Sequence, residues 1–214
     1  RALGGAGLVV VGATAVSPEG RISPSDLGIW SDDHARAFRP IIKAVQEAGC
    51  RIAVQLAHAG RKASTFPPWK GKGRVPPEEG GWEPLAPSPT AFDEEYAVPR
   101  ELGLEEIERL LRAFGDAARR AMEAGFDAVE IHGAHGYLIH QFLSPLANRR
   151  NDSYGGDLAG RSRFLREVVR SVRQAVPETA PVLIRVSATD WIPGGWDVDR
   201  SEEHTSELQS RQVI

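Results

Sequence analysis

Four short apolar runs that alternate with segments of helical apolar spacing constrain the fold more than any other feature. The runs cover residues 8–11, 51–56, 128–132 and 182–186, and their β-branched residues are typical of buried strands. Strands that alternate with helices favour a parallel sheet with crossover helices, which is an α/β fold. Four βα units of irregular spacing suit half of a (β/α)8 TIM barrel, because a complete barrel needs about 250 residues. A doubly wound open sheet is the alternative, although no Gly-x-Gly-x-x-Gly motif follows any strand.

Composition argues against several classes of protein. The 214 residues carry a net charge of -3 without a basic stripe on any predicted helix, so nucleic acid and anionic membranes are poor partners. No apolar run approaches the roughly 20 residues that span a bilayer, and no signal-peptide pattern is present. The single cysteine, Cys50, fits a reducing cytoplasm, so we expect a cytoplasmic protein with Cys50 as a small core residue.

Two helices have clear boundaries in the sequence. Ser31 predicts an N-cap, and four apolar residues then follow at helical spacing up to Gly49. Pro40 lies inside this pattern, so we expect it to kink or split the helix. A longer amphipathic helix begins near Leu104 and should end before Gly125. The expected apolar face of the first helix is Phe38, Ile41, Ile42 and Val45, and further helices are expected over 139–146 and 164–172.

Residues 61–99 form a long connection rich in proline and glycine. A connection of roughly 40 residues is far above the usual four to six, which indicates an active-site loop or a disordered segment. Its aromatic residues are too many for a disordered linker, so we expect a packed excursion, with a hairpin as one option. These aromatic residues are Trp69, Trp82, Phe92 and Tyr96.

Both ends of the chain differ from an ordinary open reading frame. The chain begins at Arg1 and its only methionine is Met122, so we expect a fragment in which residues 1–199 form a partial barrel. Residues 200–214 have almost no apolar face and resemble the translated read-through of a sequencing-library adapter. A genuine polar helix start is the alternative.

Strand parity identifies the polar side chains that face away from the helices. In the third strand, two aliphatic residues suit the helix layer, which leaves Glu130 and His132 on the opposite face. The same alternation directs Gln55 of the second strand and Arg185 of the fourth to that face. Gln55, His132 and Arg185 should therefore meet at the C-terminal ends of the strands, where barrel active sites lie.

A cluster of two imidazoles and a phenol follows the third strand. His132, His135 and Tyr137 could hold an anion or a carbonyl oxygen and deliver a proton. The alternatives are hydrogen-bonded core histidines, a packed tyrosine, or a metal pair, for which no third ligand is clearly spaced. Three nearby arginines are expected to form salt bridges within loops rather than to bind phosphate, namely Arg149, Arg150 and Arg161.

Several motifs resemble the old yellow enzyme family of FMN-dependent ene-reductases. The most specific is the run from Val129 to Asn148, which contains His-Gly-Ala-His-Gly-Tyr and continues through 149–156 and 161–164. Gln-Leu-Ala-His-Ala-Gly-Arg at 55–61 and Ala-Pro-Ser-Pro at 86–89 also match. Residues 12–21 look most like the bacterial xenobiotic-reductase subgroup. The resemblance covers nearly all of residues 7–199.

The resemblance implies an enzyme with FMN as its cofactor and NADH or NADPH as its reductant. By that resemblance, Ala13 would contact the flavin through its backbone and Gln55 would bond the pyrimidine edge of the ring. Arg185 would lie near the N1/C2 oxygen edge, where its charge stabilises the reduced anionic flavin.

The resemblance also implies how substrate would bind and react. His132 and His135 would bind the carbonyl or nitro oxygen of an activated alkene. Tyr137 would protonate the α-carbon while flavin N5 delivers hydride to the β-carbon. The implied partners are small electrophilic molecules, and neither nucleic acid nor a membrane is expected. The parent protein could be a homo-oligomer.

The resemblance to the family is incomplete at both ends of the chain. The family's first strand would lie before Arg1, and the strands that carry most of its FMN phosphate site would follow Asp199. We therefore expect this chain alone to be inactive. The alternatives are a dienoyl-CoA reductase with an iron–sulfur cluster, a metal-dependent barrel hydrolase that uses His132 and His135, and a non-catalytic binding barrel.

Overall fold

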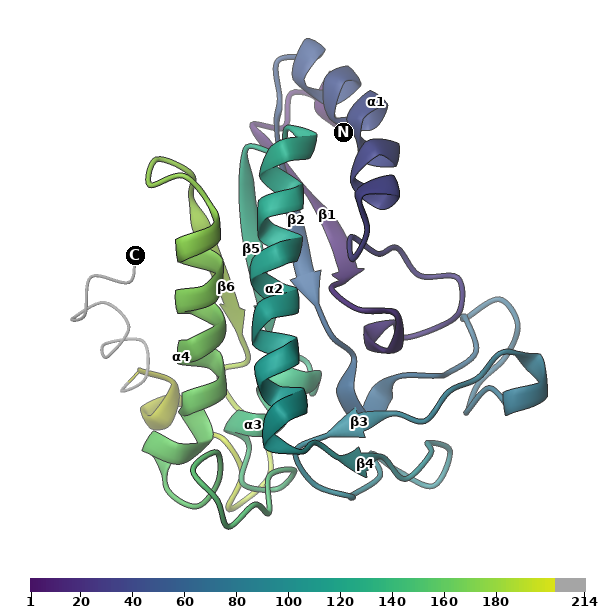
Figure 1. Cartoon of the computed structure of the whole chain (residues 1–214), viewed down its shortest axis with the longest axis vertical. Helices are drawn as coiled ribbons and strands as arrows, with labels where there is room; N and C mark the ends of the chain where they lie inside the picture. The colour runs from purple at the N-terminus through teal and green to yellow at the C-terminus, as the bar shows by residue number, and fades with distance from the viewer. Residues whose placement is uncertain (203–214) are drawn as a thin grey trace.

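The computed structural model describes residues 1–202 and contains a four-stranded parallel sheet (Figure 1). Neighbouring strands follow chain order, as they do in a (β/α)8 barrel and not in a doubly wound sheet, whose strand order reverses. The prediction of a partial barrel is therefore confirmed. In spatial order the strands are β1 (Leu8–Ala15), β2 (Arg51–Ala57), β5 (Ala128–Gly133) and β6 (Val182–Val186).

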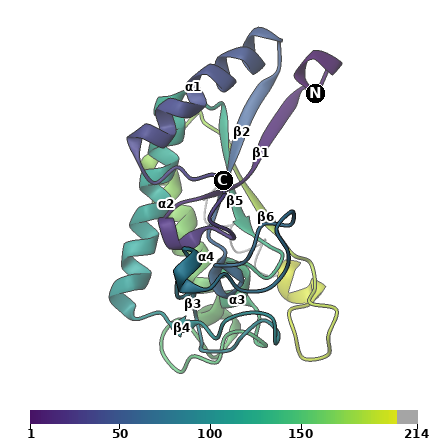
Figure 2. The same ribbon diagram turned by 90° about the vertical axis from the view of Figure 1, so that its right-hand side faces the viewer.

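The principal helices cover one face of this sheet. Figure 2 shows α1 (Asp32–Glu47) and α2 (Leu104–Ala124) on the same side of the strands, and α2 packs between α1 and α4 (Leu158–Ala175). The short α3 (Leu138–Leu143) follows β5 after one turn and ends before Ser144, because a residue that precedes a proline disfavours helical geometry. Short 3-10 helices cover Ala2–Gly4, Pro18–Gly20, Gly60–Lys62 and Pro77–Glu79.

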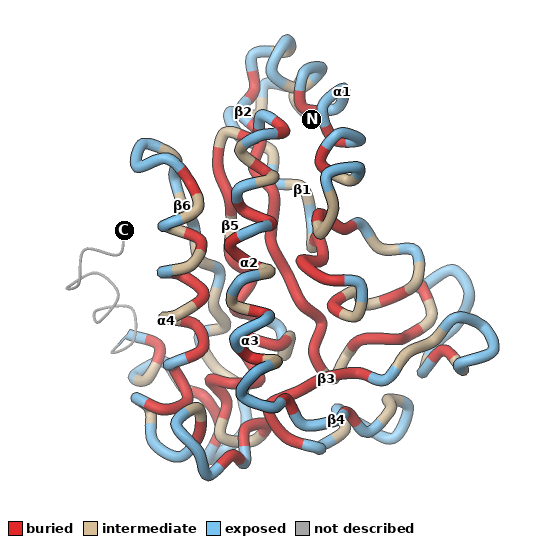
Figure 3. Tube along the Cα trace, viewed as in Figure 1, coloured by how far each residue is buried: buried red, intermediate tan, exposed pale blue. Residues whose placement is uncertain are grey.

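The hydrophobic core lies between the sheet and these helices, where Figure 3 shows the buried positions. Alternate residues of the central strands point into it, as strand parity predicts, because side chains alternate between the two faces of a strand. Burial of each such side chain stabilises the fold by about 1.5–3 kcal/mol. Side chains in this layer with at most 1% of their surface exposed include Ile52, Val54, Leu56, Phe114, Val129, Ile131, Phe164 and Val168.

Strand β1 is longer than the sequence predicted. The apolar run ends at Val11, but the strand continues to Ala15 through a register shift between Val11 and Thr14. Two residues of β1, Gly12 and Ala13, lie opposite one residue of β2, which is the geometry of a β-bulge. The expected strand over residues 8–11 was therefore too short, because a bulge allows glycine within a strand.

Helix α1 begins as predicted but buries a narrower face. Ser31 caps it, with its Oγ accepting a hydrogen bond from the His34 N–H at 3.3 Å. Pro40 lies inside an uninterrupted helix, so the predicted split does not occur. Phe38 and Ile42 are buried, whereas Ile41 is 52% exposed, since the helix contacts the core along one edge only.

The connection over residues 61–99 packs against the barrel. Its chain contains an antiparallel bridge between Thr65 and Arg74, and β3 (Leu85–Ala86) pairs in parallel with β4 (Arg100–Glu101). Trp82 anchors it by donating from Nε1 to the Glu19 carbonyl at 2.9 Å. Trp69, by contrast, is 75% exposed. Contacts with residues outside the connection therefore hold it in place.

The structure bears on three further predictions, which concern Cys50, membrane-spanning helices and the C-terminal tail. Cys50 is a free, buried thiol, as expected of a core residue. Within residues 1–202 no helix is long and apolar enough to cross a membrane. Of the proposed non-native tail, Arg200–Glu202 continue a helical turn that begins at Val198, and residues 203–214 lie outside the described part of the chain.

Candidate active site

The C-terminal ends of the four parallel strands bring together all the residues that strand parity selected. Gln55 on β2 lies opposite Glu130 on β5, and its Nε2 donates to Glu130 Oε1 at 2.5 Å. His132 on β5 lies opposite Arg185 on β6. The bulge of β1 brings Ala13 beside Gln55. We call this edge, made of Ala13, Gln55, His132 and Arg185, the strand rim.

The two histidines and the tyrosine form a compact cluster at the strand rim. The His132 ring centroid lies 5.1 Å from that of His135 and 5.1 Å from that of Tyr137, with both pairs edge to face. His132 is buried, Tyr137 is half-buried and His135 is exposed. The three rings thus present polar atoms from the barrel interior out to solvent.

Burial and nearby positive charge keep both histidines neutral. Burial, aided by His135 and Arg185, lowers the pKa of His132 to about 4. The pKa of His135 is also lowered, by the partial desolvation of its otherwise exposed ring and by the charges of Arg185 and Lys62. His132 Nδ1 accepts a hydrogen bond from the Ala134 N–H at 3.3 Å, so the neutral ring carries its proton on Nε2. His132 is therefore a neutral hydrogen-bond donor.

Tyr137 keeps its proton at neutral pH. Burial raises the pKa of its phenol, and the negative charge of Asp26 raises it further. Lys62 lies above the Tyr137 ring, with Nζ 5.2 Å from the centroid. The phenol is thus a proton donor held beside two imidazoles.

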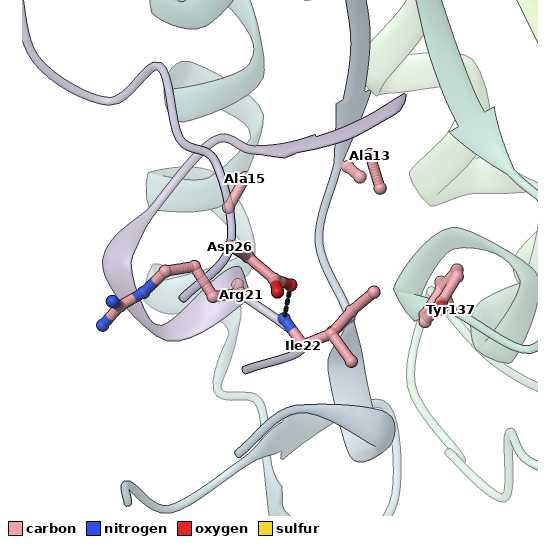
Figure 4. A pocket seen from close by; sticks show the side chains of 9 residues that line it. Ala13, Ala15, Arg21, Ile22, Asp26 and Tyr137 are labelled. Carbon is pink, nitrogen blue, oxygen red and sulfur yellow. Dashed lines mark hydrogen bonds between the residues drawn. The ribbon is translucent and has the colours of Figure 1, made fainter. Parts of the chain in front are cut away.

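A small cavity opens between Tyr137 and the bulge of β1 (Figure 4). Its floor consists of alanine and glycine, so little side-chain volume fills the space beside Ala13. In Figure 4 the Ile22 side chain points toward Tyr137, whereas Arg21 points away. The Asp26 carboxylate fixes this loop by accepting the Ile22 N–H at 2.7 Å. The small residues of the lining are Ala13, Ala15, Gly20, Ala57 and Ala59.

Of the three nearby arginines, Arg150 forms the expected salt bridge, whereas Arg161 lies in α4 and donates to backbone carbonyls. Arg150 is buried and pairs with Asp152 at 2.5 Å. Arg161 is buried and donates from Nε to the Leu143 carbonyl at 2.9 Å. No group of three or more His, Cys, Asp or Glu side chains within residues 1–202 could hold a metal ion.

Several residues that hold the cluster escaped the sequence analysis. The turn after β5 is held by Lys62, His140, Gln141 and Ser187, and Asp190 lies behind His140. The contacts of Lys62, Ser187 and Asp190 join residues far apart in the chain, so no local spacing reveals them. Those of His140 and Gln141 to Gly136 are local. The only signal was a third histidine, His140, eight residues after His132.

Comparison with known proteins places this geometry in a family. The family model described as NADH:flavin oxidoreductase / NADH oxidase matches residues 1–212. An NADPH dehydrogenase of Clostridium acetobutylicum is 50% identical over 194 residues, which cover 91% of this chain and 53% of that protein. The chain spans about half the length of the curated relatives it matches.

Solved structures agree with this assignment. An old yellow enzyme homologue of Zymomonas mobilis superimposes with a TM-score of 0.78 at 35% identity, covering 94% of this chain and 57% of that one. A 2-naphthoyl-CoA reductase in complex with 2-naphthoyl-CoA superimposes with a TM-score of 0.87 at 29% identity, covering 98% of this chain and 32% of that one. The chain belongs to the NADH:flavin oxidoreductase / NADH oxidase family.

Proposed function

We propose that the protein carrying this chain is an FMN-dependent oxidoreductase that uses NADH or NADPH to reduce electron-poor alkenes, such as enones and nitroalkenes. The observation that carries the proposal is the cluster of His132, His135 and Tyr137 beside Gln55 and Arg185. When bound, FMN accepts hydride from the nicotinamide and passes it to the alkene. The residues of this chain bind and orient the flavin and the substrate, and they protonate the substrate.

The strand rim suits the polar edge of a flavin ring. The bulge takes Gly12 and Ala13 out of the paired register with β2. The Gly12 carbonyl accepts from Thr14 Oγ1 at 2.9 Å, so we assign the Ala13 backbone to the ligand. The Gln55 amide offers a donor and an acceptor, and the Arg185 guanidinium offers a positive charge on an exposed side chain. We assign Ala13, Gln55 and Arg185 to the flavin.

We assign His132 and His135 to the oxygen of the substrate. A neutral imidazole donates a hydrogen bond without the cost of burying a charge, and the pKa of His132 near 4 keeps it neutral. Two donors at one oxygen polarise the conjugated alkene and stabilise the negative charge that develops as hydride arrives. This is the electrostatic effect of an oxyanion hole.

We assign Tyr137 to protonation of the α-carbon. Its phenol is protonated at neutral pH, because burial and Asp26 raise its pKa. A phenol is a weak acid, but a developing carbanion is a strong base, so the transfer is favourable. His132 packs edge to face against the Tyr137 ring and holds the two groups in one geometry.

A second candidate is a reductase of unsaturated coenzyme A thioesters. The similarity to a 2-naphthoyl-CoA reductase favours it, and the same three residues would bind the thioester oxygen and protonate carbon. The two candidates differ in substrate size and in any iron–sulfur cluster outside this chain.

The visible spectrum of the full-length gene product tests the proposal. We expect a yellow protein that releases FMN on denaturation, is bleached by NADPH without oxygen, and regains its absorbance with 2-cyclohexen-1-one but not with cyclohexanone. A protein that binds no flavin from excess FMN would contradict the proposal. Reoxidation by an enoyl-CoA alone, with iron in the protein, would favour the second candidate.

A further inference from the structure

The turn that carries His135 and Tyr137 has an unfavourable backbone conformation. His135 has φ 60° and Gly136 has φ 71°, so two consecutive residues are in the left-handed region. For a residue with a side chain this conformation costs about 1–2 kcal/mol. The turn therefore needs contacts from outside to hold it, and its shape sets the positions of His135 and Tyr137.

Every backbone polar group of this turn has a partner. The His135 N–H donates to Ser187 Oγ at 2.9 Å, and its carbonyl accepts from Lys62 Nζ at 3.2 Å. The Gly136 carbonyl accepts from Gln141 Nε2 at 2.7 Å. The Gly136 N–H donates to His140 Nδ1, also at 2.7 Å. An imidazole nitrogen that accepts a hydrogen bond carries no proton, so His140 must be the Nε2–H tautomer.

Asp190 provides the group that selects this tautomer. His140 Nε2 is buried, makes no hydrogen bond to any other described residue, and lies 3.0 Å from Asp190 Oδ1, within ion-pair range. Both side chains are almost completely buried. Asp190 is itself fixed, because its Oδ2 accepts from Ser144 Oγ at 2.6 Å and from the Trp196 N–H at 2.8 Å. Burial alone would raise the pKa of Asp190, but hydrogen bonds from His140 and Ser144 lower it to about 2.

We propose that Asp190 and His140 are positioning residues for the active site, in which Asp190 holds His140 in the tautomer that fixes Gly136 and thereby aligns His135 with Tyr137. This inference rests on the proposed function for its effect on rate. The tautomer of His140 does not depend on that function, because it follows from the bonds to Gly136 and Asp190 alone.

Asp190→Asn tests the tautomer directly. The Trp196 N–H can only donate, so the Asn amide must turn its oxygen toward Trp196 and its NH2 toward His140. His140 Nε2 would then accept, its proton would move to Nδ1, and Nδ1 would face the Gly136 N–H as a second donor. The variant thus keeps the side-chain volume of Asp190 and changes the tautomer of His140.

His140→Asn serves as the matched variant. The Asn Oδ1 can take the place of His140 Nδ1 as the acceptor of the Gly136 N–H, and Asn has no tautomer to select. His140→Leu removes the acceptor altogether. We expect His140→Asn to keep most of the activity that His140→Leu loses.

The experiment combines ring 15N NMR with kinetics on the full-length gene product. In protein labelled with 15N-histidine, the His140 signals, identified by their loss in His140→Asn, should show Nε2–H in the parent and Nδ1–H in Asp190→Asn. A parent spectrum with Nδ1–H on His140 overturns the proposal, whatever the rates of the variants.

The kinetic arm separates positioning from a general structural role. We expect Asp190→Asn to slow reoxidation of the reduced flavin by 2-cyclohexen-1-one about 10–100-fold. In the His140→Asn background the same change should alter the rate less than about twofold, because no tautomer remains to be set. An equal loss in both backgrounds overturns the proposal. If the parent itself reduces no alkene, the proposed function fails, and the 15N spectra still decide the tautomer.

Discussion

His58 illustrates how burial can set the charge of a side chain near the strand rim. It is 1% exposed, and its Nδ1 accepts the Gly60 N–H at 3.0 Å. Burial lowers its pKa to about 4, although the negative charge of Glu19 opposes the shift. The unfolded chain would protonate this histidine below pH 6.5, whereas the folded protein resists protonation down to about pH 4.

This difference predicts a loss of stability in acid. The contribution of His58 is complete above pH 6.5 and falls as the pH drops from 6.5 toward 4, because the unfolded state binds more protons there. At pH 5 the loss is about 2 kcal/mol. We expect His58→Asn, which keeps an acceptor for Gly60, to lack this part of the loss. Urea unfolding of both proteins at pH 7.5 and pH 5.0 measures it, and parallel losses would contradict the assignment.

The sequence predicted the positions of Gln55, His132 and Arg185 at the strand rim, because all three lie on strands. Parity selected Gln55, His132 and Arg185 because a strand has only two faces and the aliphatic residues occupy one of them. It could not select His140 or Asp190, whose roles come from a contact between residues 50 positions apart. Nothing local to either residue records that contact.

At the scale of elements, the ends of helices were more predictable than irregularities of strands. Helix α2 ends before Gly125, whose φ of 107° is accessible to glycine at little cost. The bulge in β1 was missed, since it depends on the register with β2 and not on the sequence of β1 alone. The bulge also places Ala13, so a prediction based on the resemblance was needed for that residue.

A buried arginine joins the excursion to the barrel. The guanidinium of Arg150 donates from one nitrogen to the carbonyls of Pro87 at 3.1 Å and Leu102 at 2.7 Å, and it pairs with Asp152. Its side chain is 4% exposed. These bonds tie the segment that contains β3 and β4 to the loop after α3.

We expect Arg150→Met to destabilise the protein by about 3–5 kcal/mol, because it leaves a carboxylate and two buried carbonyls without their partner. Limited proteolysis should show earlier cleavage within residues 61–99. Arg149→Ala is the control, since its side chain is exposed and its backbone N–H keeps the bond to Ser88 Oγ. Equal protease resistance of Arg150→Met and the parent would refute the role of Arg150.

At the scale of the whole molecule, the alternation of strands and helices was sufficient to predict half of a barrel. The order of β1, β2, β5 and β6 follows from right-handed crossovers that each join two neighbouring parallel strands. The path of the excursion could not be predicted, because its anchors, such as Trp82 to Glu19, lie in different parts of the chain.

The isolated chain should not behave as a complete flavoprotein. β1 and β6 are the edge strands of the described sheet, and edge strands expose unpaired backbone groups that favour self-association. We expect the 214-residue chain to retain no FMN after gel filtration and to elute as oligomers, whereas the full-length gene product retains FMN. Stoichiometric, tightly held FMN in the isolated chain would contradict this prediction.

Tyr137 is the proton donor in the proposed reaction. Anaerobic stopped-flow absorbance of Tyr137→Phe in the full-length gene product follows the two half-reactions separately and tests this role. The matched control is Tyr154→Phe, whose phenol donates to Glu167 at 2.7 Å. We predict that Tyr137→Phe slows reoxidation of the flavin by 2-cyclohexen-1-one about 10²–10⁴-fold and leaves its reduction by NADPH intact, whereas Tyr154→Phe changes neither rate. Unchanged reoxidation, or an equal loss of both half-reactions, would contradict the account.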